Sequence, residues 1–168
     1  MVIILACWFS ARSRKPYSIS IRFLISSTDA AKLPIDEAID KISYPNKGVL
    51  TGKALEFAAK ELFSKSPGGK DVLLLITDGP SFDDVREPAT ELKRRGVEIF
   101  CLGIGQGYAR NQLSFIASDP VNEHLFTAPF KGTETVIGPV KDRICRISKS
   151  TGKIQNHFCF LYQHRKSR

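Results

Sequence analysis

The sequence predicts an α/β fold, namely a Rossmann-like open sheet that is mainly parallel and carries helices on both faces. Residues 72–76 and 97–104 form short apolar runs rich in branched side chains, which is typical of strands buried on both faces. From residue 51 onward, such runs alternate with segments in which apolar residues recur at helical spacing. Alternating helices and strands build parallel sheets, so these observations together predict the fold class.

The elements expected before the central run are shorter. In residues 17–26, apolar side chains alternate with mostly polar ones, which predicts a strand with one solvated face near a sheet edge. Residues 35–42 have the spacing of a short amphipathic helix. A clear helix follows from Thr51, and its apolar stripe consists of Leu55, Ala58, Ala59 and Leu62.

A further helix is expected after the central strand. Asp83 and Asp84 are predicted to cap it, and Pro88 falls in its first turn, where a missing N–H does no harm. Gly96 is expected to end it, because glycine readily adopts the left-handed conformation that closes a helix. The strand of residues 97–104 then begins.

Three further elements complete the predicted fold. They are a helix over residues 111–117, a strand over residues 123–127 and a last helix over residues 134–147. The pair Gly138-Pro139 is expected to interrupt that last helix, because proline cannot donate the backbone hydrogen bond that a helix interior requires.

The net charge of +8 lies at the two ends of the chain. Residues 1–16 carry three basic residues and no acidic one, and residues 141–168 carry eight basic residues and one acidic. The part predicted to fold is therefore slightly acidic. Nucleic-acid binders concentrate basic residues on the folded surface, so this distribution argues against a nucleic-acid partner and favours solvated tails.

The four cysteines, Cys7, Cys101, Cys145 and Cys159, lack the spacing of a zinc site. Cys101 lies in an apolar run and is predicted to be a buried thiol, whereas the sequence does not determine a partner for Cys145 or Cys159. No apolar stretch reaches the roughly 18 residues of a membrane span. Residues 2–9 are apolar and precede small residues, as in a secretory signal, but the stretch is short and lacks a preceding basic residue.

Four stretches resemble one known family. They are Lys47-Gly-Val-Leu-Thr-Gly-Lys-Ala-Leu55, the central run ending in Thr77-Asp-Gly79, Asp83-Asp-Val-Arg-Glu-Pro88 and residues 96–105. Their order and spacing over residues 18–146 are similar to those of von Willebrand factor type A domains, especially those of matrilins and collagen-associated matrix proteins. The resemblance implies a secreted, non-enzymatic adhesion module whose partner is an extracellular protein such as collagen or another matrix protein.

The family builds a metal-ion-dependent adhesion site at the carboxyl edge of its sheet, and the resemblance implies that this chain keeps only part of it. Asp78 matches the carboxylate of the third loop, and Thr51 matches the second threonine of the second loop. Val49 occupies the position of the ligating threonine and offers no oxygen. The Asp-x-Ser-x-Ser loop is absent. Because Mg²⁺ prefers near-octahedral oxygen ligands, we expect a degenerate site, with Mg²⁺ as its candidate ion and no certain cofactor.

Two simpler roles remain open for these residues. An aspartate before glycine at the end of a strand is a common turn residue, so Asp78 can shape the turn. Thr51 can cap the helix that follows it.

The resemblance divides the chain into residues 1–16, a partial type A domain over residues 17–147 and a basic tail over residues 148–168. Residues 2–9 have the character of the family's missing first strand. Nine residues separate Phe9 from Ile19, however, and a parallel crossover with its helix needs roughly a dozen or more. The segment can pair antiparallel or lie elsewhere, or the domain can lack its first strand–helix unit; the last is our expectation, with residues 1–16 foreign to the fold.

The sequence gives little support to an enzymatic function. Gly103-Ile-Gly-Gln-Gly107 follows a strand but does not have the spacing of a dinucleotide-binding loop, so we interpret it as a glycine-rich strand exit. His124, predicted to begin the strand of residues 123–127, has no nucleophile or acid in a triad-like pattern. The alternatives to an adhesion module are a nucleotide- or phosphate-using α/β enzyme on the same scaffold and an inactive fragment.

Overall fold

The computed structural model describes residues 2–8, 49–63 and 71–150, with the backbone alone for residues 2–8 and 147–150. The strand predicted over residues 17–26 and the helix predicted over residues 35–42 lie outside the described residues. So does most of the predicted basic tail. The predicted division of the chain at residues 16 and 147 stays a prediction.

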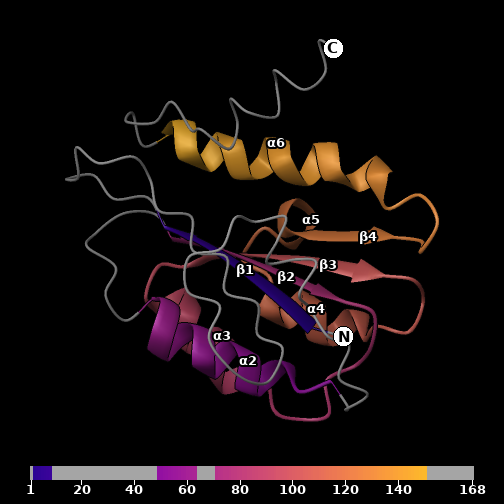
Figure 1. The fold of residues 1–168 in the computed structure, drawn as a ribbon. Helices are drawn as coiled ribbons and strands as arrows, with labels where there is room; N and C mark the ends of the chain where they lie inside the picture. The colour runs from indigo at the N-terminus through magenta and orange to yellow at the C-terminus, as the bar shows by residue number, and fades with distance from the viewer. Residues whose placement is uncertain (1, 9–48, 64–70, 151–168) are drawn as a thin grey trace, which may run out of the picture.

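The described residues contain a four-stranded sheet in the order β1-β2-β3-β4 (Figure 1). Its central strands are β2 (Asp71–Thr77) and β3 (Glu98–Ile104), which pair in parallel. The short strand β4 (Leu125–Ala128) pairs in parallel with β3. The two predicted buried strands are therefore confirmed, together with the mainly parallel sheet.

Strand β1 (Val2–Trp8) pairs antiparallel with β2, from Val2 opposite Thr77 to Trp8 opposite Asp71. Antiparallel pairing was one of the alternatives left open for residues 2–9, and it is the one that the structure shows. The expectation that the segment is foreign to the fold is wrong for these seven residues. The physical reason is that β1 pairs with β2, which begins only at Asp71, so the short connection between Phe9 and Ile19 does not limit this pairing.

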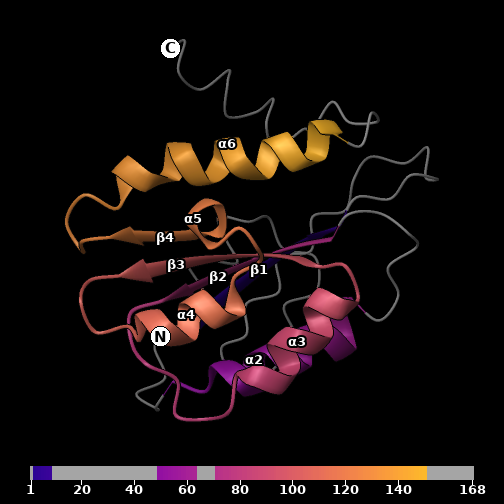
Figure 2. The ribbon, with the colours of Figure 1, turned by 180° about the vertical axis from the view of Figure 1, so that it is seen from behind.

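Helices cover both faces of the sheet, as predicted (Figures 1 and 2). On one side lie α2 (Thr51–Phe57), which continues into the π-helical turn η1 (Ala58–Leu62), and α3 (Arg86–Arg94) and α4 (Arg110–Ile116). On the other side lies the long α6 (Glu134–Ser150), next to β4. One turn of helix, α5 (Val121–His124), precedes β4 directly.

Two predictions for the last third of the chain are wrong. The strand expected over residues 123–127 begins at Leu125, because residues 121–124 form α5 and His124 ends that turn instead of beginning the strand. Helix α6 also continues through Pro139 without interruption. Pro139 lies early in α6 and leaves only the carbonyl of the exposed Thr135 without its usual donor, which water can replace.

One apolar cluster joins the sheet to α2, α3 and α4. Leu55 of α2, Leu92 of α3 and Ile99 of β3 are fully buried in it. Gly96, which ends α3, has a φ of +82°, so a left-handed residue turns the chain into β3 as predicted. The cluster fixes the relative positions of the loops that leave the carboxyl ends of β2 and β3.

Candidate functional site

Three loops meet at the carboxyl edge of the sheet. The Phe82 N–H donates a hydrogen bond of 3.0 Å to the Val49 carbonyl, which joins the loop after β2 to the residues before α2. A Cβ placed on Gly107 would lie 2.7 Å from the Asp78 carbonyl oxygen, so the loop after β3 packs closely on the same edge. Direct contacts thus bring the residues before α2 together with the loops after β2 and β3.

Asp78 lies directly after β2 and is partly buried. The turn that holds it is closed by Thr77, whose Oγ1 donates to the Gly79 carbonyl at 3.1 Å and lies 3.3 Å from the Gly79 nitrogen. Asp78 itself has an interaction partner within the chain. Asp78 thus lies at the carboxyl end of the central strand.

The hydroxyl of Ser81 and the carboxylate of Asp83 cap helix α2 from the neighbouring loop. The Thr51 N–H donates to Ser81 Oγ at 2.9 Å. The N–H groups of Gly52 and Lys53 donate to the two Asp83 oxygens at 2.9 and 2.8 Å. Asp83 was expected to cap the helix after it, so this prediction is wrong: its side chain satisfies donors at the start of an earlier helix.

Thr51 is the first residue of α2 and is only 2% exposed, whereas Leu50 holds the capping position and provides no side-chain hydrogen bond. The alternative of Thr51 as the capping residue is therefore not what the structure shows. Asp84 keeps its predicted role near α3, because its Oδ1 accepts the Arg86 N–H at 3.0 Å. The sequence could not indicate that capping at α2 comes from across the edge.

The acidity of Asp83 follows from this arrangement. Burial raises the pKa of its carboxyl, but the hydrogen bonds from Ser81 and from the backbone of Lys53 and Gly52 lower that pKa further than burial raises it. Asp83 therefore remains ionised at the positive end of α2, where a negative charge is favourable.

The resemblance aligns Val49 with a ligating threonine of the family. A Cβ placed on Gly79 would be 3.5 Å from Val49 Cγ2, so the valine side chain packs against the turn that follows Asp78. Within the described ranges, no cluster of three or more His, Cys, Asp or Glu residues could hold a metal ion. Asp78 offers one carboxylate and Thr51 one hydroxyl that is only 2% exposed, so water would have to supply most of the six oxygen ligands that Mg²⁺ takes. They do not by themselves fit the ion, and their role as ligands stays a prediction.

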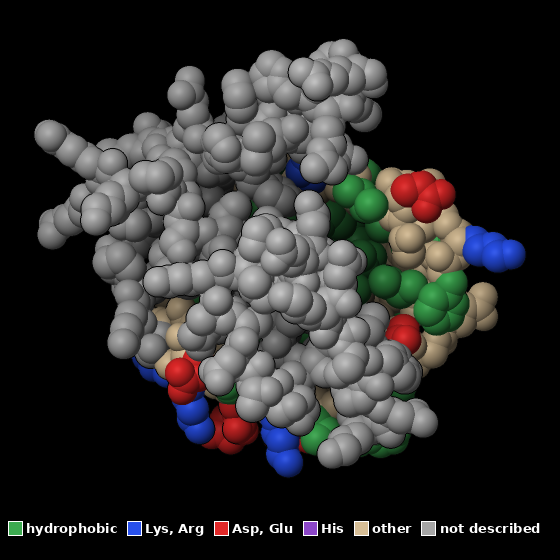
Figure 3. All heavy atoms as spheres, viewed as in Figure 1, with side chains coloured by type: hydrophobic (Ala, Val, Ile, Leu, Met, Phe, Trp, Pro, Cys, Tyr) green, Lys and Arg blue, Asp and Glu red, His purple; other side chains and the backbone are tan. Residues whose placement is uncertain are grey.

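Large apolar side chains reach the surface along this edge, and the sequence analysis missed them. Phe82 is 76% exposed, Phe130 is 67% exposed and Leu50 is 42% exposed. Figure 3 shows hydrophobic side chains at the surface on the side toward which the β3 and β4 arrows point in Figure 1. A phenylalanine in a segment with the composition of a loop is the sequence signal that could have identified Phe82 and Phe130. We call Leu50, Phe82 and Phe130 the apolar rim.

The glycines at the end of β3 and in the loop after it are explained by packing. A Cβ on Gly103 would lie 2.8 Å from the Tyr108 ring, and a Cβ on Gly105 would lie 2.3 Å from the Phe130 ring. Gly105 also has a φ of +76°, which favours glycine. These contacts agree with the interpretation of this segment as a strand exit.

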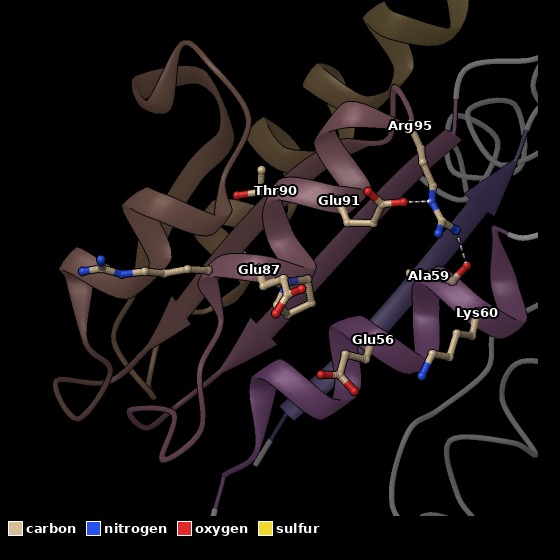
Figure 4. A pocket seen from close by; sticks show the side chains of 9 residues that line it. Glu56, Ala59, Lys60, Glu87, Thr90, Glu91 and Arg95 are labelled. Atoms are coloured by element: carbon tan, nitrogen blue, oxygen red, sulfur yellow. Dashed lines mark hydrogen bonds and ion pairs between the residues drawn. The ribbon is translucent and has the colours of Figure 1, made fainter.

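A separate groove of about 640 Å³ lies between α2–η1 and α3 (Figure 4). At one end of the groove, Arg95 Nη1 donates to the Ala59 carbonyl at 2.8 Å and Arg95 Nε donates to Glu91 at 2.7 Å. Hydrogen bonds from Arg94 and Arg95 lower the pKa of Glu91 to about 2. The arginine thus ties the end of α3 to the π-helical turn, which is a structural role.

Comparison with known proteins identifies the fold. The model of the von Willebrand factor type A domain matches residues 16–135. The chain belongs to this family. It is 34% identical to vitrin of Bos taurus over 118 residues, which is 69% of this chain and 18% of vitrin. It is 36% identical to matrilin-1 of Bos taurus over 119 residues, which is 68% of this chain and 22% of matrilin-1.

Solved structures of this type A domain family include the proximal thread matrix protein 1 of the mussel byssus. The form described as having a zinc-occupied MIDAS motif is 31% identical, with a TM-score of 0.56, and the match covers 63% of this chain and 27% of that one. The chain spans about a fifth of the length of vitrin and matrilin-1. The family resemblance seen in the sequence is confirmed.

These relatives also place the type A domain of this chain outside the cell, in the extracellular matrix, as the sequence resemblance predicted. Cys145 is disulfide-bonded, and disulfides persist in oxidising, extracellular compartments. In the part of the chain that the structure describes, no helix has the length and apolar character needed to cross a bilayer.

Proposed function

We propose that this type A domain is a non-enzymatic protein-interaction module of the extracellular matrix that binds its partner through the carboxyl-edge loops by direct side-chain contact. The observation that supports it is the composition of this edge. Val49 packs where a ligating oxygen is needed, and Phe82 stands 76% exposed in the loop that also carries Asp78. Exposed aromatic side chains are frequent anchors of protein interfaces.

The proposed partner is an extracellular matrix protein, with collagen as the first candidate. This choice rests on the matrix relatives and on the position of the edge in the family fold. In a complete adhesion site, a bound cation accepts an acidic residue of the partner. The proposal differs for this chain, because direct contact with the apolar rim replaces the bridge through a cation.

An enzyme on the same scaffold is the alternative, and the described residues give it little support. Cys101 is fully buried, and burial strongly raises the pKa of its thiol, so it is a poor nucleophile. Ser118 Oγ accepts the Ile99 N–H in the interior. Each glycine of the loop after β3 lies against a side chain or a carbonyl, where a phosphate would need open backbone N–H groups.

A solid-phase binding assay on immobilised matrix proteins, including collagen, tests the proposal. We expect saturable binding that is the same in EDTA and in Mn²⁺, and that falls at least about tenfold for Phe82→Ser, as for a buried aromatic anchor. Phe115→Ser is the matched control, because Phe115 is an exposed phenylalanine on α4. Binding that needs a divalent cation, or an equal loss in both variants, would contradict the proposal.

A further inference from the structure

Gln112 on α4 binds the backbone of the loop after β2 with its side chain. Its Oε1 accepts the Ser81 N–H at 2.9 Å, across 31 residues of sequence. Its Nε2 donates to the Ser81 carbonyl at 3.1 Å. One side chain therefore satisfies both backbone groups of the residue that precedes the exposed Phe82.

The chemistry of the primary amide explains why a glutamine suits this place. Its side chain carries an acceptor and a donor on the same carbon, as the backbone does at the two ends of a peptide group. The Ser81 nitrogen can only donate and its carbonyl oxygen can only accept, so the two groups fit Gln112 in a single orientation. The pair of hydrogen bonds therefore fixes the direction of the Ser81 backbone as well as its position.

Helix α4 is a firm support for this contact. Leu113 and Ile116, on its inner face, are 3% and 1% exposed and belong to the apolar cluster that joins the helices to the sheet. Gln112 is half-buried beside them. A loop that is held from a packed helix inherits the rigidity of the core.

The same loop is held on its other side by the residues at the start of α2. The Thr51 N–H donates to Ser81 Oγ at 2.9 Å, and the Phe82 N–H donates to the Val49 carbonyl at 3.0 Å. Helices α2 and α4 lie on the same side of the sheet (Figure 2). The backbone of residues 81 and 82 is therefore hydrogen-bonded to both of them.

The phenyl ring of Phe82 is nevertheless 76% exposed. An exposed ring on a loop that moves freely loses conformational freedom when a partner binds it, and that loss lowers the affinity. A loop that is already fixed in the free protein avoids most of the loss. The combination of a bonded backbone and an exposed ring is thus what a preorganised interface anchor requires.

We infer that Gln112 is a positioning residue for partner binding, which holds Ser81 so that the ring of Phe82 is presented in one place at the carboxyl edge. This role rests on the proposed function, in which Phe82 anchors the partner. Gln112 acts through the loop and not by touching the partner. Its contribution to the affinity therefore exists only while Phe82 is present.

Amide hydrogen exchange of the full chain, without any partner, tests the contact itself. Gln112→Met keeps an unbranched side chain and a similar helix propensity, but removes both the acceptor and the donor. The Ser81 and Phe82 amides should exchange about tenfold faster or more, as expected for two lost hydrogen bonds, while those of Leu73 and Leu75 in β2 stay unchanged. Unchanged exchange at Ser81 would overturn the inference.

Asn111→Met is the matched control. Asn111 is the exposed amide residue that precedes Gln112 on α4, and its Oδ1 accepts the N–H of Gln112 instead of reaching the loop. This variant should leave the exchange at Ser81 as in wild type, and an equal acceleration in both variants would refute a specific role for Gln112. In wild type, the side-chain amide protons of Gln112 should also exchange more slowly than those of the exposed Gln106. This measurement gives an answer even where Gln112→Met fails to fold.

A double-mutant cycle on immobilised collagen tests the role in binding. Gln112→Met should weaken the affinity of the full chain by about threefold to tenfold, as the loss of preorganisation does. In the Phe82→Ser background, the same change should have no further effect, because residues that act through one another are not additive. An equal loss in both backgrounds would show that Gln112 acts independently of Phe82 and would overturn the inference.

The same cycle separates this inference from the proposed function. If Phe82→Ser weakens binding but Gln112→Met does not, although its loop amides exchange faster, the inference is wrong and the proposed function stands. If neither change weakens binding, the carboxyl-edge loops are not the binding surface. That result would overturn the proposed function and with it the role of Gln112.

Discussion

The Asp83 carboxylate accepts the backbone N–H of Lys53, thirty residues earlier in the chain, at 2.8 Å. Its other oxygen accepts the Gly52 N–H at 2.9 Å. One side chain therefore satisfies two of the donors that the first turn of a helix leaves unpaired. The contact also couples the loop that carries Asp78 to the start of α2, so the geometry of the candidate site depends on it.

Asp83→Ala should lower the free energy of unfolding by about 1–2 kcal/mol, as the loss of a helix-capping side chain usually does. The measurement is urea unfolding at pH 7. Glu56→Gln is the control, because Glu56 is exposed on α2 and makes no ion pair among the described residues. An equal effect of both changes would show that the cap contributes nothing specific.

The same cap predicts a pH dependence. Burial raises the pKa of Asp83, but the hydrogen bonds that it accepts hold that pKa below the ordinary value of 3.8. A carboxyl with a depressed folded-state pKa stabilises the protein fully above its unfolded-state value and loses that effect as the pH falls through the folded-state pKa. Below pH 4, wild type should therefore lose its advantage over Asp83→Ala. A difference between the two proteins that is constant from pH 2 to pH 6 would contradict this.

Two glycines in helices have different surroundings. A Cβ on Gly52 would lie 2.0 Å from the Asp84 carbonyl oxygen, whereas a Cβ on Gly138 meets nothing within 4 Å. Gly52→Ala should cost about 1–3 kcal/mol through overpacking. Gly138→Ala should change the stability less, because the helix propensity of alanine is opposed by the restriction that Pro139 places on helical backbone at the residue before it. Thermal unfolding of both variants checks the pair, and an equal loss of stability in both would contradict the overpacking at Gly52.

The extent to which the sequence predicted these features depends on how local their causes are. The strand of residues 72–76 was predictable, because each residue in it carries an apolar side chain, and Val72, Leu73 and Leu75 are buried. α5 was not, since one helical turn of four residues shows no period. The antiparallel pairing of β1 and the capping of α2 by Asp83 both depend on partners distant in sequence. The apolar rim was missed because its three residues come from three separate loops.

Cys101 should resist alkylation in the native protein. Its side chain is fully buried, so the reagent cannot reach the sulfur. Burial also raises the pKa of its thiol, so the reactive thiolate is not formed. Iodoacetamide should modify the peptide that contains Cys101 only in the presence of urea, as followed by mass spectrometry. Rapid modification without denaturant would show that the core around β3 opens in the native state.

Metal binding should be weak and insensitive to Asp78. Val49 packs against the turn at Gly79 and offers no oxygen, and Asp78 is the single carboxylate that the resemblance assigns to the site. Mn²⁺ titration by calorimetry should therefore give no saturable one-to-one site, and Asp78→Ala should give the same result as wild type. Val49→Thr adds one hydroxyl oxygen at the position where the resemblance places a ligand, but Asp78 stays the single carboxylate that the resemblance assigns to the site, and water would have to supply most of the six ligands that such an ion takes. We therefore expect this variant to remain metal-free as well. A saturable Mn²⁺ site in wild type that Asp78→Ala abolishes would mean that further oxygen donors complete the site. The proposal that the partner binds by direct contact with the apolar rim would then lose its main support.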